Sequence, residues 1–364
     1  MADPAAAAPD RRRTPAARAA WLAAIALSLA GAAAAGAWLW NERYGTHEER
    51  DAEGRVLARW KLRAGERHGP YVAFNPDGSP RREVHYQHGR RHGADVLYWP
   101  GGRKRREGAW QDDRPTGAWR EWYASGSLRS EGAYAGNERG EPAAPVGPWR
   151  AFAPDGTLTS EGAYVDGQKE GEWRRFWPDG TPQSQGAYAA GEQTGPWTLW
   201  FQNGARRSEG PWRNGQREGD WSEWYENGQL KSQGRYRAGE RVGDWTHWRE
   251  DGGIQVEVRE SEQDGHVLRH VRTFFADGSP RSEERFRDGV LHGPAVYGYP
   301  GGAPFEQGAF VDGKRDGTWR LHPFAGAPPA EIEWRSGERL TPLPGGMMAP
   351  GAPHPIGGRG RHGF

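Results

Sequence analysis

The chain repeats one pattern every 24 residues, and this period constrains its fold more than any other feature. The stretch from Gly219 to Gly243 reads GDWSEWYENGQLKSQGRYRAGERVG. We number the places in a repeat as offsets from its opening glycine, so that Trp221 stands at offset 2 and Tyr236 at offset 17. A fixed period of roughly 20–50 residues is the signature of a repeat architecture.

The glycine at offset 9 marks every repeat. It recurs as Gly54, Gly78, Gly102, Gly126, Gly156, Gly180, Gly204, Gly228, Gly252, Gly278, Gly302 and Gly326. These positions predict about twelve repeats over residues 45–340. In such an array each repeat buries its apolar side chains only against its neighbours. This explains why 55 of the 364 residues are glycine and why the hydrophobic content is only 35%.

The overall charge and the cysteine count limit the classes of function. A net charge of +1 creates no overall field that would favour nucleic acid or an acidic membrane. The chain has no cysteine, which excludes disulfides, thiolate metal sites and a cysteine nucleophile but leaves the compartment open.

The N-terminal segment has the pattern of a membrane anchor. Residues 1–20 are rich in Ala and Pro and carry four arginines, and residues 21–40 read WLAAIALSLAGAAAAGAWLW without a charge. Twenty uncharged residues suffice to cross a bilayer as a helix, and the preceding arginines favour a cytoplasmic N-terminus. We therefore expect a single-pass inner-membrane protein with its repeats in the periplasm or outside the cell. The alternative is a secreted protein whose signal peptide is cleaved, although signal peptides usually have shorter apolar cores.

Each repeat is predicted to form a β-hairpin, with strands over offsets 1–6 and 10–18. Several repeats have Pro-Asp-Gly at the first turn, and a proline there cannot donate a ladder hydrogen bond. The pattern favours a three-residue loop, a type I turn followed by a left-handed glycine. Offset 6 then lies opposite offset 10, which pairs Trp224 with Leu230 and Trp221 with Gln233.

Offsets 2 and 5 have opposite parity, so both faces of the sheet should carry aromatic side chains. No helical periodicity follows residue 41. The sequence therefore predicts an all-β fold, an elongated antiparallel array of hairpins in one curved layer, after the N-terminal helix.

Two repeats depart from the period, and the C-terminus leaves it. Six residues are inserted after Gly136, which predicts a longer loop. Between Gly252 and Gly278 the spacing is 26, and Arg269 replaces the glycine at offset 0, so this repeat is degenerate but in register. Residues 341–364 are rich in Pro and Gly and are expected to be disordered.

No polar constellation in the sequence predicts catalysis. His68, His92 and His292 each precede an offset-0 glycine, and Glu107 and Glu131 share offset 14, so these residues follow the register of the repeat. The basic run 103–106 occurs once, and the glycines are followed by strands and not by a helix that would bind phosphate. We expect no metal, no cofactor, no nucleic-acid partner and no enzymatic activity.

The aromatic residues divide into two slots. Offset 2 holds the expected structural residues Trp119, Trp149, Trp173, Trp197, Trp221 and Trp245. Offset 6 varies, and it supplies the expected binding residues Tyr123, Trp177, Phe201 and Tyr225. A slot that stacking requires should be filled alike in every repeat, whereas a contact slot varies with the part of the partner it meets. Alanine at Trp221 should then destabilise the fold, and alanine at offset 6 should weaken binding.

The pattern G-x-W-x-x-[WF]-[YWF]-x-x-G, followed by E/Q-G-x-Y-x-x-G, resembles the bacterial variant of the MORN (membrane occupation and recognition nexus) repeat. Such chains often carry the label of toxin–antitoxin system antitoxins of the YwqK type. The resemblance covers roughly Gly45 to Leu340. It implies antiparallel hairpins in an elongated curved sheet, used for contact with proteins or lipids, and no catalytic residues.

These observations lead to a functional expectation with one alternative. We expect a membrane-anchored, non-enzymatic scaffold that binds a protein partner and is antitoxin-like in family. The alternative is a protein that binds carbohydrate or cell wall, because the aromatic repeats of Gram-positive wall-binding proteins look similar although their units are shorter.

Overall fold

The computed structural model describes residues 43–135 and 143–341, and every element within these ranges is a strand. The expected membrane helix at 21–40, the basic segment 1–20, most of the inserted loop and the tail from residue 342 lie outside the described residues. The chain divides into two compact bodies. The first runs to Leu158 and includes Tyr164–Gln168; the second comprises Thr159–Ala163 and the chain from Lys169 onward.

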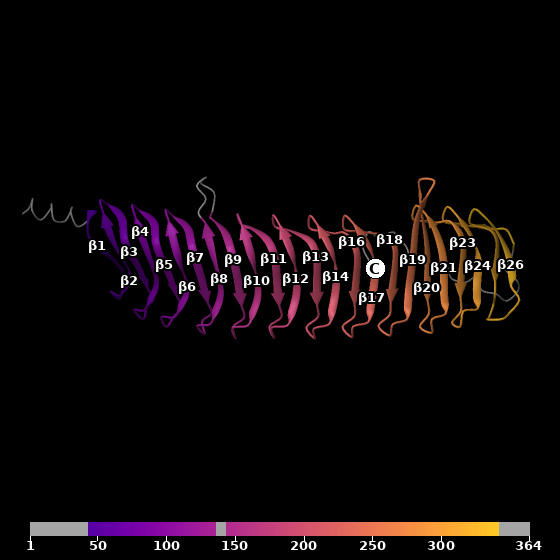
Figure 1. Ribbon diagram of the computed structural model, residues 1–364, viewed down its shortest axis with the longest axis horizontal. Coiled ribbons are helices and arrows are strands. Elements are labelled where there is room, and N and C mark those ends of the chain that lie inside the picture. Colours follow the sequence, from indigo (N-terminus) through magenta and orange to yellow (C-terminus); the bar gives the residue numbers. More distant parts are fainter. Residues whose placement is uncertain (1–42, 136–142, 342–364) are drawn as a thin grey trace, which may run out of the picture. The chain divides into compact units, whose positions relative to one another are not determined.

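The first body is built from consecutive antiparallel strands. They are β1 (Thr46–Arg50), β2 (Val56–Arg63), β3 (Glu66–Phe74), β4 (Pro80–Gln87), β5 (Arg90–Tyr98), β6 (Lys104–Gln111), β7 (Arg114–Trp122), β8 (Leu128–Ala135) and β9 (Ala144–Phe152). Each strand pairs with the one before it and the one after it in the chain (Figure 1). The boundary between the bodies falls within β10 (Leu158–Val165).

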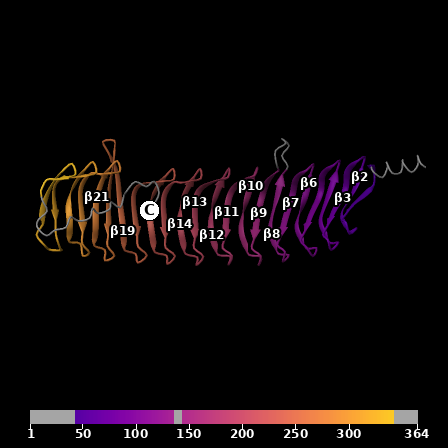
Figure 2. The ribbon, with the colours of Figure 1, turned by 180° about the vertical axis from the view of Figure 1, so that it is seen from behind.

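The second body continues the same arrangement. Its strands are β11 (Gln168–Phe176), β12 (Pro182–Ala189), β13 (Glu192–Trp200), β14 (Arg206–Arg213), β15 (Gln216–Arg217), β16 (Gly219–Trp224), β17 (Leu230–Arg237), β18 (Glu240–Trp248), β19 (Ile254–Gln263), β20 (His266–Phe274), β21 (Pro280–Arg287), β22 (Val290–Leu291), β23 (Gly293–Gly298), β24 (Pro304–Val311), β25 (Lys314–Leu321), β26 (Ala330–Arg335) and β27 (Glu338–Arg339). Seen from behind, the strands keep this chain order (Figure 2).

The first turn has the predicted form in every repeat but the last, where a longer loop joins Leu321 to Ala330. In the repeat that opens at Gly219, the amide of Tyr225 donates to the carbonyl of Gln229 at 2.8 Å, and the amide of Gly228 donates to the carbonyl of Tyr225 at 3.0 Å. Gly228 has a φ of +85°, in the left-handed region. The three-residue loop is therefore confirmed, with glycine where a side chain would be strained.

The register beyond the turn differs from the prediction for offset 2. Trp224 pairs with Leu230, as expected, but a β-bulge follows at Lys231, and Glu223 pairs with Ser232. Trp221 consequently lies opposite Gly234, and the predicted pairing of Trp221 with Gln233 is wrong. A bulge inserts one unpaired residue into one strand, so every later pair shifts by one.

The second turn is a two-residue turn in which both residues are left-handed, in every repeat except the one that carries the insertion after residue 136, which lies mostly outside the described residues. Between Arg237 and Glu240, which pair, Ala238 and Gly239 have φ of +49° and +82°. Gly239 also donates its amide to the carbonyl of Arg217 in the preceding turn at 2.9 Å. Beyond this turn the strand bends at the offset-0 glycine, where Gly243 has a φ of +66° and the register shifts by two residues between Val242 and Trp245.

The 26-residue repeat lacks that bend. This explains both its longer spacing and the presence of Arg269 in place of the glycine at offset 0. Strands β19 and β20 pair without interruption from Val256 opposite Thr273 to Gln263 opposite His266. In a regular repeat, two residues at the offset-0 bend have no partner in the neighbouring strand. The two added residues lengthen β19 enough to pair with the corresponding residues of β20. No left-handed residue is then needed at offset 0, and Arg269 is accommodated. This straight hairpin extends beyond its neighbours (Figure 1, orange).

Candidate functional site

The tryptophans at offset 2 lie over glycines of the preceding repeat. Within the second body Trp221 is only 1% exposed, and its ring covers Gly210. The same arrangement joins Trp119 to Gly108, Trp149 to Gly132, Trp173 to Gly162, Trp197 to Gly186, Trp245 to Gly234 and Trp319 to Gly308; in all seven pairs a Cβ on the glycine would lie 2.1 to 2.4 Å from the ring. Glycine at offset 15 is therefore required for packing and not for a turn.

Six of these seven rings donate their indole N–H to the same neighbouring strand, whereas the buried Nε1 of Trp119 has no hydrogen-bond partner among the described residues. Trp221 Nε1 donates to the carbonyl of Pro211 at 3.0 Å, and Trp173 Nε1 donates to that of Ala163 at 3.0 Å. Each acceptor directly follows the covered glycine. Ring packing thus holds all seven indoles between two repeats, and the hydrogen bond fixes six of them.

Aromatic residues at offset 17 join the buried rings into a continuous row. Trp212, Trp221, Tyr236 and Trp245 contact one another edge to face, with ring centroids 5.1 to 6.0 Å apart. A cation two residues before the repeat covers this row, as Arg217 does at 4.4 Å from the Trp221 ring centre. Such edge-to-face and cation–π contacts add to the free energy of burial.

The expected binding residues at offset 6 lie at the three-residue turns and are half-buried. They are Tyr123 in the first body and Trp177, Phe201 and Tyr225 in the second. Tyr225 donates its hydroxyl to the carbonyl of Trp248 in the next repeat at 2.9 Å, and Tyr123 donates to Phe152 in the same way. These tyrosines therefore also connect repeats, which the sequence did not indicate.

Cations from offset 12 lie over two of these rings. Lys231 stands 5.5 Å from the ring centre of Tyr225, and Arg129 stands 5.9 Å from that of Tyr123. Lys231 is the residue that the bulge leaves without a partner. Each turn with this pairing thus presents an aromatic side chain and a positive charge together.

In one repeat a charged pair takes the place of the tryptophan at offset 2. Asp95 occupies this slot, is 1% exposed, and accepts both hydrogen bonds of the Arg82 fork at 2.9 and 3.0 Å as well as one from Trp110 Nε1. The hydrogen bond to Asp95 raises the pKa of Arg82. This pair is fully partnered and fills a packing position.

A second buried charge lies in the second body. Glu306 is 2% exposed and pairs with Arg315 at 2.8 Å, and burial raises the pKa of Glu306. Tyr297 donates to Glu284 at 2.8 Å, and burial next to that carboxylate raises the pKa of Tyr297. The buried polar groups of each pair are thus hydrogen-bond or ion-pair partners of one another. Over residues 43–135 and 143–341 no group of three or more His, Asp or Glu side chains is placed to hold a metal ion.

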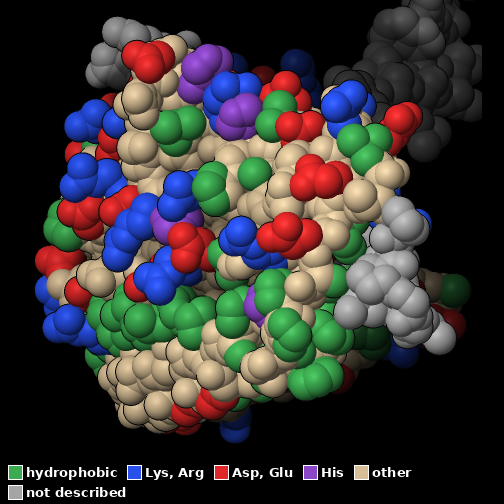
Figure 3. All heavy atoms as spheres, turned by 90° about the vertical axis from the view of Figure 1, so that its right-hand side faces the viewer, with side chains coloured by type: hydrophobic (Ala, Val, Ile, Leu, Met, Phe, Trp, Pro, Cys, Tyr) green, Lys and Arg blue, Asp and Glu red, His purple; other side chains and the backbone are tan. Residues whose placement is uncertain are grey.

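The opposite face of the second body is polar and carries charges of both signs. Arg235 bonds Asp220 at 2.8 and 3.2 Å, and Arg320 pairs with Glu331 at 3.2 Å. Viewed toward its C-terminal strands, basic and acidic side chains intermix (Figure 3). Within the part of the chain that the structure describes, no helix is long and apolar enough to cross a membrane.

Comparison with known proteins identifies the repeat. Residues 67–88, 115–135, 169–190 and 217–238 match the model of the MORN repeat variant. Each segment spans one hairpin. No curated protein matches this chain.

The solved structures that match this chain belong to much larger chains. "Crystal Structure of TcdB2-TccC3-Cdc42" is 13% identical over 80% of this chain and 17% of its own, with a TM-score of 0.18. "Crystal Structure of TcdB2-TccC3-TEV" is 15% identical over 81% and 17%, also with a TM-score of 0.18. The chain spans less than a fifth of those chains. Four segments of this chain thus match the MORN repeat variant, and each of them is an antiparallel β-hairpin.

Proposed function

We propose that the chain is a membrane-anchored, non-enzymatic scaffold that binds a protein partner through its MORN-variant hairpins. The observation that supports this most is the contrast between the two aromatic slots. The offset-2 rings are packed against glycines, whereas the offset-6 side chains vary in type and remain half-exposed, and two of them lie beside cations. An array of variable aromatic and cationic side chains suits recognition of a protein surface.

Phe201→Ala is the sharpest test of this row, because among the described residues the Phe201 side chain forms no hydrogen bond to another repeat. We expect it to lower recovery of a stoichiometric partner from detergent-solubilised membranes, with little change in thermal stability. Arg235→Gln, on the polar face, is the control and should leave capture unchanged. Unfolding by Phe201→Ala, or undiminished capture, would count against the contact row.

The same capture separates the alternatives. Retention on purified cell wall that free sugar elutes, without a protein partner, would favour the carbohydrate-binding alternative. An antitoxin would be one kind of protein-binding scaffold, and its captured partner would then be toxic when expressed without this chain and harmless when expressed with it.

The anchor belongs to the proposal as well, since residues 21–40 supply its uncharged span. A reporter that is active only in the periplasm, fused after Arg339, should be active. A silent periplasmic reporter beside an active cytoplasmic one at the same place would reverse the proposed topology.

A further inference from the structure

A pocket of about 330 Å³ lies beside the straight hairpin β19–β20. Its lining comes from β19, β20 and β21 and from Gly293 and Pro294 in the next strand. The hairpin β19–β20 runs straight, whereas the following strand bends at Gly293, which has a φ of +100°. The pocket therefore lies where a straight hairpin meets a bent one, at the one repeat whose spacing is 26.

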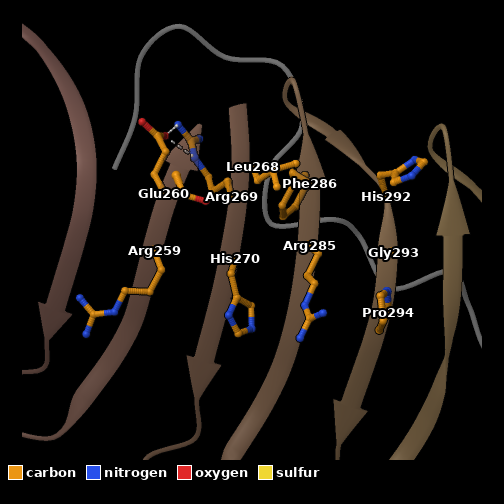
Figure 4. Close-up of a pocket in the computed structure, with 11 residues that line it drawn as sticks. Arg259, Glu260, Leu268, Arg269, His270, Arg285, Phe286, His292, Gly293 and Pro294 are labelled. Carbon is orange, nitrogen blue, oxygen red and sulfur yellow. Dashed lines mark hydrogen bonds and ion pairs between the residues drawn. The ribbon is translucent and has the colours of Figure 1, made fainter. Parts of the chain in front are cut away.

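Three basic or titratable side chains form a row across the pocket. Arg259 pairs with His270 between β19 and β20, and His270 pairs with Arg285 between β20 and β21. Adjacent strands lie about 4.8 Å apart, so directly opposed residues extend from the same face as close neighbours. Figure 4 shows Arg259, His270 and Arg285 extending in the same direction.

The guanidinium of Arg285 has N–H donors that are not hydrogen-bonded within the described residues. It is 50% exposed, and among the described residues it forms no hydrogen bond, only an ion pair with Glu283 at 3.7 Å. Glu283 also lies 2.9 Å from His270 Nε2, so one carboxylate serves two groups of the row. A guanidinium has five N–H donors in a fork that matches a carboxylate.

The remaining charges around the pocket are paired. Arg259 contacts Asp244 through one nitrogen at 3.2 Å, and Arg269 contacts Glu260 at 2.7 Å. His292 lies 3.4 Å from Asp312. The incompletely bonded donors are thus those of the row, at Arg285 and on the other nitrogens of Arg259.

Apolar side chains complete the lining. Leu268, Phe286 and Pro294 line the same pocket as the row. A cationic row beside an apolar wall fits a ligand with a carboxylate next to an apolar side chain better than it fits a bare inorganic anion or a nucleic-acid backbone.

We propose that this pocket binds a short acidic segment of a partner protein, with a carboxylate over Arg259, His270 and Arg285 and an adjacent apolar side chain against Leu268 and Pro294, which extend from the same face of the sheet. The proposal rests on the proposed scaffold function and assigns one element of its recognition surface. It adds a site that differs in position and chemistry from the aromatic row at the turns.

A comparison of labelled peptides tests the proposal with the full chain in detergent. The probes are fluorescein-labelled Gly-Ser-Glu-Leu-Glu-Ser-Gly and two relatives in which the central residues are Gln-Leu-Gln or Glu-Ser-Glu. Fluorescence anisotropy should show saturable binding of the first peptide and weaker binding of both relatives. Equal binding of all three peptides, or none, would overturn the proposal.

Matched variants locate the binding. Arg285→Gln should weaken binding of the acidic peptide by about fivefold or more, because it removes a charged donor of the site. Arg235→Gln is the control: Arg235 shares offset 16 with Arg285 but bonds Asp220 through two nitrogens. It should leave the affinity unchanged, and equal losses in both variants would indicate a general charge effect and refute the site.

Partner capture distinguishes the failure of this site from the failure of the scaffold. If Arg285→Gln captures the partner normally and binds the peptide normally, the pocket proposal is refuted while the scaffold stands. If no partner is captured by any form of the chain, the scaffold proposal fails, and the peptide titration still decides whether the pocket binds an acidic segment.

Discussion

At the scale of single residues, the repeat is held together by a glycine and a tryptophan that face each other across neighbouring strands. Gly234 lies opposite Trp221 in its own hairpin and opposite Trp245 in the next. The Trp245 ring occupies the space where a side chain at residue 234 would begin. Glycine is therefore kept at offset 15 wherever a tryptophan follows, and Glu284 takes its place where Ala295 follows instead.

Gly234→Ala tests this pairing directly. The added Cβ would lie 2.2 Å from a ring carbon of Trp245, so the ring or the strand must move. We expect a loss of about 1–3 kcal/mol in the free energy of unfolding, measured by urea denaturation. In a double-mutant cycle with Trp245→Ala the two losses should be less than additive. Strict additivity would mean that the ring and the glycine do not interact.

His247 supplies a pH-dependent contribution to stability. Its ring stacks on Trp245 at 5.9 Å, and burial, with a smaller effect of Arg241, lowers the pKa of His247. As the pH falls below about 6.5, the unfolded chain takes up a proton that the folded chain resists, so stability is lost. His247→Gln should show a smaller drop in the urea midpoint between pH 8 and pH 5.5 than the natural chain. An equal or larger drop would contradict this assignment.

At the scale of the element, each hairpin is defined by two different turns and one bend. The three-residue turn ends in a left-handed glycine, the two-residue turn has two left-handed residues, and the bend at offset 0 requires a third left-handed position. Each of these conformations is available to glycine at little cost. The straight hairpin β19–β20 omits the bend because its two added residues make it unnecessary.

Gly195→Ala isolates the conformational requirement of the bend. Gly195 has a φ of +64°, and nothing lies within 4 Å of an added Cβ, so any loss reflects the backbone alone. We expect a loss of about 1–2 kcal/mol in the free energy of unfolding. Arg269 occupies the same offset in the straight hairpin, where φ is not positive. Arg269→Ala should therefore cost no more free energy of unfolding than the loss of an exposed ion pair, about 0–1 kcal/mol. Equal losses at the two positions would argue against the bend.

At the scale of the whole chain, each body is an array in which contacts join only neighbouring repeats. Every strand pairs with strands close to it in the sequence, and the aromatic row passes from one repeat to the next. The stability of such an array is a sum of repeat terms and nearest-neighbour terms. A destabilising substitution in one repeat should therefore loosen mainly that repeat and its neighbours.

Trp221→Ala tests this locality. Removing a ring that is 1% exposed should cost about 3–5 kcal/mol in the second body. Hydrogen exchange should show lost protection in β14, β16, β17 and β18, with β3 to β8 of the first body unchanged. Protection lost equally throughout both bodies would show that the chain unfolds as one cooperative unit.

The sequence alone determined the features that are local or periodic. The 24-residue period, the all-β class and the three-residue turn follow from residues that are neighbours in the chain. The slots at offsets 2 and 6 were also visible as a constant and a varying position. These features can be read because turn conformation and strand alternation depend on short segments.

The tertiary structure decided what depends on contacts between repeats. The bulge at Lys231 shifts the register by one and places Trp221 opposite Gly234, while the Trp221 ring covers Gly210 of the preceding repeat. The hydroxyl of Tyr225 bonds a carbonyl that lies 23 residues away, and the row of Arg259, His270 and Arg285 forms only when three strands align. Side-chain packing sets these registers, because one residue of slip moves every side chain to the other face of the sheet.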